Sequence, residues 1–132
     1  KAWDLLNSVR TRAEATSITE ANYDEMMSAR KKTHNLTFID DSTPEGKFRT
    51  ALYWERGFEL AFEGQRKYDL IRWGVLGKAL KLFGEISSVN QKENKPYPAY
   101  RNFTEGKHEL FPIPLKEIQS NPKLNGMNNN GY

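Results

Sequence analysis

Hydrophobic residues recur at helical spacing along most of the chain, which predicts a mostly α fold with helices joined by long irregular loops. In the first segment, residues 1 to about 14, one helical face carries Trp3, Leu6, Val9 and Ala13. A second helix is expected from about residue 19 to residue 32, because Ser17-Ile18-Thr19-Glu20 has the spacing of a capping box.

A third helix has the clearest start signal. Thr43 can cap free amides, Pro44 suits the first helical position, and Glu45 complements the positive end of the helix dipole. Gly64 should close or bend this helix, because glycine adopts the left-handed conformation that ends many helices.

The second half of the chain predicts two shorter helices, at 67–74 and 75–87, with Phe83 among the inward residues of the latter. A polar, proline-containing loop follows at 88–100. The tail is rich in proline and asparagine, which indicates irregular backbone held against a neighbouring surface, with one helical turn near 115–120.

Charges alternate with large hydrophobic side chains in segment 54–74. Three glutamates, at 55, 59 and 63, recur every four residues on one stripe of the helix. Arginines at 56 and 66 lie three residues from the second and third of them, and a further aspartate–arginine pair, at 69 and 72, is also three residues apart. Because aromatic residues cover much of the remaining circumference, these charges should be partly desolvated and therefore paired. We interpret them as a structural charge ladder, with spacing that favours pairs within the segment: Glu55, Arg56, Glu59, Glu63, Arg66, Asp69 and Arg72.

The bulk properties exclude several kinds of site. The chain has 132 residues, a formal net charge of +3 and no cysteine, so these residues contain neither disulfides nor cysteine-based metal sites. Basic and acidic residues are interspersed, which argues against nucleic-acid binding. The one basic cluster, at 30–32, suits the negative end of a helix. No apolar run approaches the ~20 residues that a membrane-spanning helix requires.

Three ordered segments share a pattern with one family. Segment 54–74 contains Glu-Arg-x-x-Glu-Leu-x-Phe-Glu-Gly-x-Arg and then Asp-Leu-x-Arg-Trp-Gly. Residues 2–13 include Asn-x-Val-Arg-x-Arg-Ala, and residues 110–122 include Pro-Ile-Pro-x-x-Glu-Ile-x-x-Asn-Pro. Together they resemble the C-terminal region of the SusD/RagB family, the surface glycan-binding lipoproteins of Bacteroidetes. The tail at 127–132 departs from the family's usual Gln-Asn-Pro-Gly-Tyr ending.

This resemblance implies that residues 1–132 are the C-terminal region of a longer chain with a tetratricopeptide-like helical scaffold. It also implies a non-catalytic protein that needs no cofactor and is held at the outer-membrane surface by an N-terminal lipid anchor outside these residues. We expect no metal site within residues 1–132. Its partners would be a glycan or other nutrient and a SusC-like TonB-dependent transporter.

One loop cluster combines aromatic faces, which can stack on sugar rings, with polar groups that can bind hydroxyls. The candidate ligand-binding residues are Tyr97, Tyr100, Arg101 and Phe103. The alternative interpretation is that the aromatic rings hold a proline-rich loop against the core.

Two other functions stay open on sequence alone. In a carboxylate-using glycoside hydrolase, Glu59 and Glu63 would be the acid and base. Interleaved arginines favour the structural interpretation, and neither His34 nor His108 has the Glu-x-x-His spacing of di-iron bundles. The second alternative is a helical protein-interaction module without a small ligand.

Overall fold

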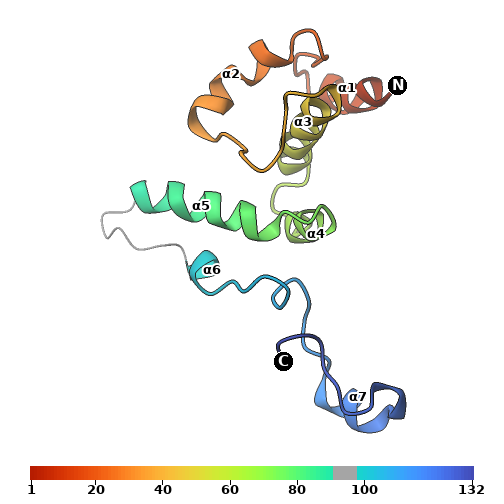
Figure 1. The fold of residues 1–132 in the computed structure, drawn as a ribbon. Coiled ribbons are helices and arrows are strands. Elements are labelled where there is room, and N and C mark those ends of the chain that lie inside the picture. The colour runs from red at the N-terminus through yellow and green to blue at the C-terminus, as the bar shows by residue number, and fades with distance from the viewer. Residues whose placement is uncertain (91–97) are drawn as a thin grey trace. The chain divides into compact units, whose positions relative to one another are not determined.

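The computed structural model of the chain describes residues 1–90 and 98–132, which divide into two compact units, residues 1–69 and 70–132 (Figure 1). Unit 1 contains α1 (Ala2–Arg12), α2 (Tyr23–Thr33), α3 (Pro44–Glu59) and the start of α4 (Arg66–Arg72). Unit 2 contains the end of α4, α5 (Leu76–Asn90), α6 (Pro98–Arg101), α7 (Leu115–Ser120) and the 3₁₀ turn η1 (Pro122–Leu124). Within the described ranges every regular element is helical, so the mostly α prediction is confirmed.

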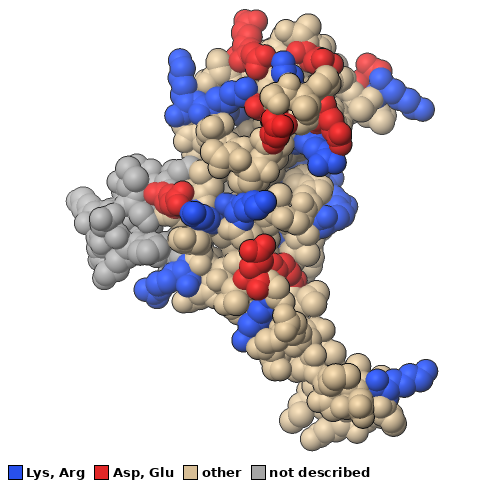
Figure 2. Space-filling model, viewed as in Figure 1, with Lys and Arg blue, Asp and Glu red and all other residues tan. Residues whose placement is uncertain are grey.

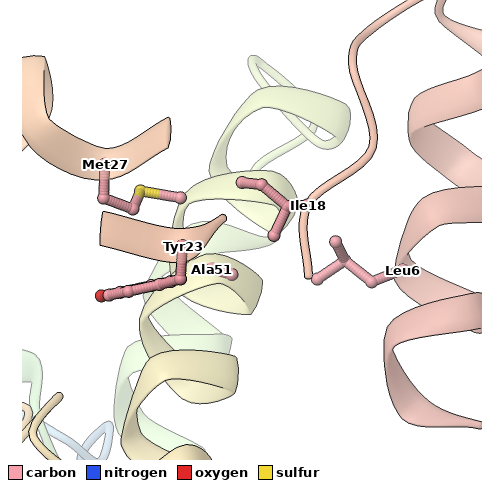
Figure 3. Packing of buried hydrophobic residues seen from close by; sticks show 5 residues of the cluster. All are labelled: Leu6, Ile18, Tyr23, Met27 and Ala51. Carbon is pink, nitrogen blue, oxygen red and sulfur yellow. The ribbon is translucent and has the colours of Figure 1, made fainter. Parts of the chain in front are cut away.

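The core of unit 1 forms where three helices meet the loop between α1 and α2 (Figure 3). Removing the side chains of Ile18 and Met27 from water stabilises the unit by roughly 1.5–3 kcal/mol each. At the edge of the core the rings of Trp3 and Phe48 meet edge to face, with centroids 5.1 Å apart. The fully buried cluster consists of Leu6, Ile18, Tyr23, Met27 and Ala51.

The loop between α1 and α2 is held by one side chain. Asn7 donates through Nδ2 to the carbonyl of Ile18 at 2.7 Å and accepts from the Ile18 amide at 2.8 Å. Both backbone groups of a buried residue are therefore satisfied without regular secondary structure. This lets the chain place Ile18 in the core from an irregular segment.

The predicted capping box before α2 is wrong, and the helix begins at Tyr23 rather than near residue 19. The side chain of Asn22 instead accepts from the Thr19 amide at 2.7 Å and donates to the Ser17 carbonyl at 3.1 Å, which closes a separate turn. The predicted start of α3 is confirmed, because Thr43 Oγ1 accepts from the Gly46 amide at 3.0 Å and Pro44 is the first helical residue.

The segment after α3 turns through two left-handed residues. Gly64 has a φ of 72°, which confirms its predicted conformation, although the helix itself ends earlier, at Glu59. Phe62 also has a positive φ, 67°, and its side chain is fully exposed. A non-glycine residue in this region costs about 1–2 kcal/mol.

In unit 2 a ring of α6 and a ring of the loop after it pack on the backbone of α5. A Cβ on Gly77 would lie 2.9 Å from the ring of Phe103, and a Cβ on Gly84 would lie 2.8 Å from the ring of Tyr100. These two glycines are seven residues apart, so they share one face of the helix. The inward prediction for Phe83 is wrong, since this side chain is 51% exposed. At this end of α5 the covered face is that of Gly84.

Asparagine side chains hold the irregular backbone of the tail together, whereas contact of the tail with a neighbouring surface stays a prediction. Asn128 accepts from the Ile113 amide at 2.7 Å and donates to the Ile113 carbonyl at 3.3 Å. Asn129 donates to the carbonyl of Phe111 at 2.6 Å. The predicted helical turn at 115–120 is confirmed as α7.

Gly46 is expected to be indispensable to unit 1. A Cβ at this position would lie 1.7 Å from the carbonyl oxygen of Asp40, so Gly46→Ala must push α3 away from the preceding loop. We expect a loss of about 3 kcal/mol in the free energy of unfolding by urea. Gly57→Ala is the matched control in the same helix, because its Cβ would meet only the Arg66 guanidinium at 3.5 Å. It should gain about 0.5–1 kcal/mol, and similar losses at both positions would contradict the packing described.

Stability should fall at alkaline pH because of a network around Tyr23. Its hydroxyl donates to Asp41 Oδ2 at 2.7 Å, and Lys31 Nζ lies 2.8 Å from the same oxygen. Burial and the hydrogen bond to Asp41 raise the pKa of Tyr23, and the bond to Asp41 raises the pKa of Lys31. Both groups therefore hold their protons more tightly when folded, so this stability is complete below about pH 10 and is lost above it.

The variant Tyr23→Phe should flatten that alkaline decline and cost about 1 kcal/mol at neutral pH, because one buried hydrogen bond is lost. Urea unfolding between neutral and strongly alkaline pH measures both effects. Tyr68→Phe is the control, since Tyr68 is 59% exposed. An unchanged pH profile in Tyr23→Phe would argue against this source of alkaline sensitivity.

Candidate functional site

Two ion pairs join α1 to α3. Arg10 Nη1 lies 2.5 Å from Glu55 Oε2, with side chains only 8% and 13% exposed. Arg12 pairs with Glu59 closer to the surface. Arg10 also donates through Nε to the Thr16 carbonyl at 2.8 Å, so its guanidinium group bonds both a carboxylate and a backbone carbonyl. The structure thus connects the pattern at 2–13 to the pattern at 54–74.

A second set of arginine contacts joins α3 to the start of α4. Arg56 donates through Nε and Nη2 to the two carboxylate oxygens of Asp69, at 2.7 and 2.9 Å. Asp69 is 4% exposed, so this forked pair is desolvated on its acidic side. Arg66 donates to the Tyr53 carbonyl at 2.9 Å, and its guanidinium lies 3.8 Å from the centre of the Tyr53 ring.

These partners differ from those that the spacing favoured. Pairing within α3 is wrong for Glu55 and Glu59, whose partners lie on α1, and Arg56 pairs with α4. Glu63 is exposed in the turn after α3 and has no ion pair with any residue that the structure describes. Neighbours on one exposed helix gain only about 0.2–0.5 kcal/mol per pair, so partners from a second helix in a desolvated contact can replace them.

A cationic and aromatic surface lies beside these pairs. Arg30 of α2 lies 4.6 Å from the ring centre of Phe58 and 5.7 Å from that of Trp54. The two rings are stacked, with centroids 6.1 Å apart and an interplanar angle of 19°. His34 meets Trp54 at 6.1 Å. We call Arg30, His34, Trp54 and Phe58 the Arg30 platform.

The surroundings of Arg30 disfavour its positive charge. Burial and the charge of Arg10 lower the pKa of Arg30, while Glu55 partly opposes this change. From the sequence, Arg30 was expected only to complement a helix end. Its contact with the rings of α3 was not predicted, because no spacing within either helix indicates which helices meet.

The structure places the predicted loop cluster only in part. Tyr97 lies outside the described residues. The rings of Tyr100 and Phe103 pack at Gly84 and Gly77 of α5, whereas Arg101 is exposed. This packing is the kind expected if aromatic residues anchor the loop, and contact with a sugar stays a prediction for these residues.

Among the described residues no group of three or more histidine and carboxylate side chains is placed to hold a metal ion. Of the two glutamates considered for acid and base catalysis, Glu59 is engaged by Arg12. His108 accepts through Nδ1 from the Thr104 amide at 2.7 Å and so serves a local turn. In the part of the chain that the structure covers, no helix has the length and apolarity needed to cross a bilayer.

Comparison with known proteins agrees with the three sequence patterns. The model of the SusD family matches residues 1–132. The chain belongs to the SusD family. Its relatives include SusD-like protein P25 of Formosa agariphila, 40% identical over 87 residues, which are 64% of this chain and 15% of that protein. SusD-like protein P2 of the same organism is 34% identical over 94 residues, which are 71% of this chain and 16% of that protein.

The predicted family and its helical fold class are therefore confirmed. The chain spans about one sixth of the length of these two SusD relatives. No solved structure matches it.

The forked pair between α3 and α4 should be important for stability. Asp69→Asn keeps the shape of the side chain but removes the charge that accepts from Arg56, so we expect a loss of about 2–3 kcal/mol in the free energy of unfolding. Glu45→Gln is the control, because Glu45 and its partner Arg49 are both exposed and the loss should be below about 0.5 kcal/mol. If both variants lost the same free energy of unfolding in urea, the Asp69 pair would contribute no more to stability than an exposed ion pair.

Proposed function

We propose that this chain is part of a non-catalytic protein that binds a glycan or other nutrient at the surface of the outer membrane. The bound nutrient would then pass to a SusC-like TonB-dependent transporter. The observation that carries this proposal is the match of the SusD family to the whole of residues 1–132. Membership of a family of surface nutrient-binding lipoproteins supports binding and uptake rather than hydrolysis.

Segment 97–103, which includes α6, is our proposed contribution of this chain to the glycan site. Tyr97, Tyr100, Arg101 and Phe103 would supply aromatic faces and a hydrogen-bond donor. Packing on α5 supports this role, because an anchored loop loses less conformational entropy when a ligand binds. Arg101, exposed next to an anchored ring, is the residue best placed to reach a hydroxyl group.

Affinity electrophoresis against a panel of soluble polysaccharides tests the proposal. We expect retarded migration with at least one glycan and no release of reducing sugar from it. Release of reducing sugar would favour the glycoside hydrolase, and absence of retardation with every glycan would count against glycan binding.

Arg101→Gln tests the loop without disturbing the packed rings and should weaken glycan binding by about 1 kcal/mol. Lys116→Gln removes the same charge from another exposed site in unit 2 and is the matched control. Tyr100→Ala opens space beside Gly84, so its folding must be checked by circular dichroism before its binding is interpreted. Equal binding by the Arg101 variant, the Lys116 variant and the parent chain would exclude Arg101 from the site.

A further inference from the structure

The N–H donors of the Arg30 guanidinium group have no acceptor among the described residues of the protein. Its contacts are with the rings of Phe58 and Trp54, and it makes no side-chain hydrogen bond or ion pair in the described ranges. Arginine carries five N–H donors, and its planar fork matches two oxygen atoms of one anionic group. Contact with aromatic rings holds the side chain in place and leaves its N–H donors available to an external acceptor.

The charged groups around Arg30 do not balance, because Arg10 and Arg30 are two cations and Glu55 is one anion. Glu55 is the acidic partner of Arg10, at 2.5 Å, and both of these side chains are largely buried. Burial and the charge of Arg10 lower the pKa of Arg30, and Glu55 opposes them only in part. A partly buried cation without a full counter-charge is unfavourable, and an external anion would relieve that cost.

The aromatic part of the Arg30 platform is also exposed to solvent. Phe58 is 52% exposed even with Arg30 over its ring. An aromatic face next to a free guanidinium suits a ligand that has both a C–H surface and an acidic substituent, as a charged sugar does. Figure 2 shows that lysine and arginine side chains are dispersed over the visible surface among acidic ones, so overall charge alone would not create such a site.

We infer that the Arg30 platform binds an acidic group of a glycan, either a carboxylate or a sulfate ester, with Arg30 as a two-point donor and Phe58 as the apolar wall. This inference rests on the proposed glycan-binding function and adds a class of substrate to it. It also places a contact in unit 1, separate from segment 97–103.

The test compares charged polymers with matched neutral ones. Polygalacturonate is paired with its fully methyl-esterified form for the carboxylate, and dextran sulfate is paired with dextran for the sulfate ester. Dissociation constants are measured by affinity electrophoresis with the whole chain at one ionic strength, because screening changes weak charge interactions. We expect preference for at least one charged polymer, and the pair that shows it identifies the acidic group.

Three variants locate the effect. Arg30→Gln should weaken binding to the charged polymer by about tenfold or more, as loss of a charge-assisted, two-point contact predicts. Lys32→Gln, which removes the same charge from an exposed neighbour on α2, should change it by less than about twofold. Arg30→Lys keeps the charge but not the fork and should fall between them. Thermal unfolding identifies any loss of folding, and Arg30→Lys carries the test if Arg30→Gln is unstable.

Three results would overturn the inference. Equal weakening by Arg30→Gln and Lys32→Gln would mean that only long-range charge attracts the polymer. Equal binding of charged and neutral polymers, unaffected by any variant, would remove the acidic-group site and leave glycan binding standing. If no polysaccharide binds at all, the proposed function fails together with the inference.

Discussion

The buried ion pair between Arg10 and Glu55 is the constraint on which unit 1 depends. These residues are separated by 45 positions in the chain, and each charge is almost wholly removed from water. Such a pair is tolerable only when its geometry is close and the remaining donors find acceptors, and here the Thr16 carbonyl takes a second donor of Arg10. Removing either partner would leave a buried charge alone. The pair therefore fixes one buried contact between α1 and α3, beside the Arg12–Glu59 pair and the Trp3–Phe48 ring contact.

The position of Arg30 follows from the same contact. With Glu55 committed to Arg10, the second guanidinium group is left to the aromatic rings of α3. Ring contact stabilises a cation less than a full ion pair does when the charge is partly desolvated. Arg30 is thus a partly buried cation without an ion pair among the described residues, which is the basis of the proposed acidic-group site.

Both units use asparagine to satisfy irregular backbone. Asn7 bonds both backbone groups of Ile18, and Asn128 does the same for Ile113. In each case an amide side chain supplies one donor and one acceptor, which is what a single unpaired peptide residue needs. Unit 2 adds glycines on α5, which let the rings of Tyr100 in α6 and Phe103 after it approach the helix backbone. Long loops can therefore be ordered with little regular structure.

The sequence by itself determined the features that depend on near neighbours. The spacing of hydrophobic residues indicated the helices, Thr43 and Pro44 marked the start of α3, and proline with asparagine marked the irregular backbone of the tail. The same patterns identified the family. Only the tertiary structure decided which charges pair, and it moved the partners of Glu55 and Glu59 from their own helix to α1. The Arg30 platform was likewise invisible in the sequence. Turns and helices are set by forces between residues a few positions apart, whereas ion pairs and ring contacts depend on which helices desolvate each other.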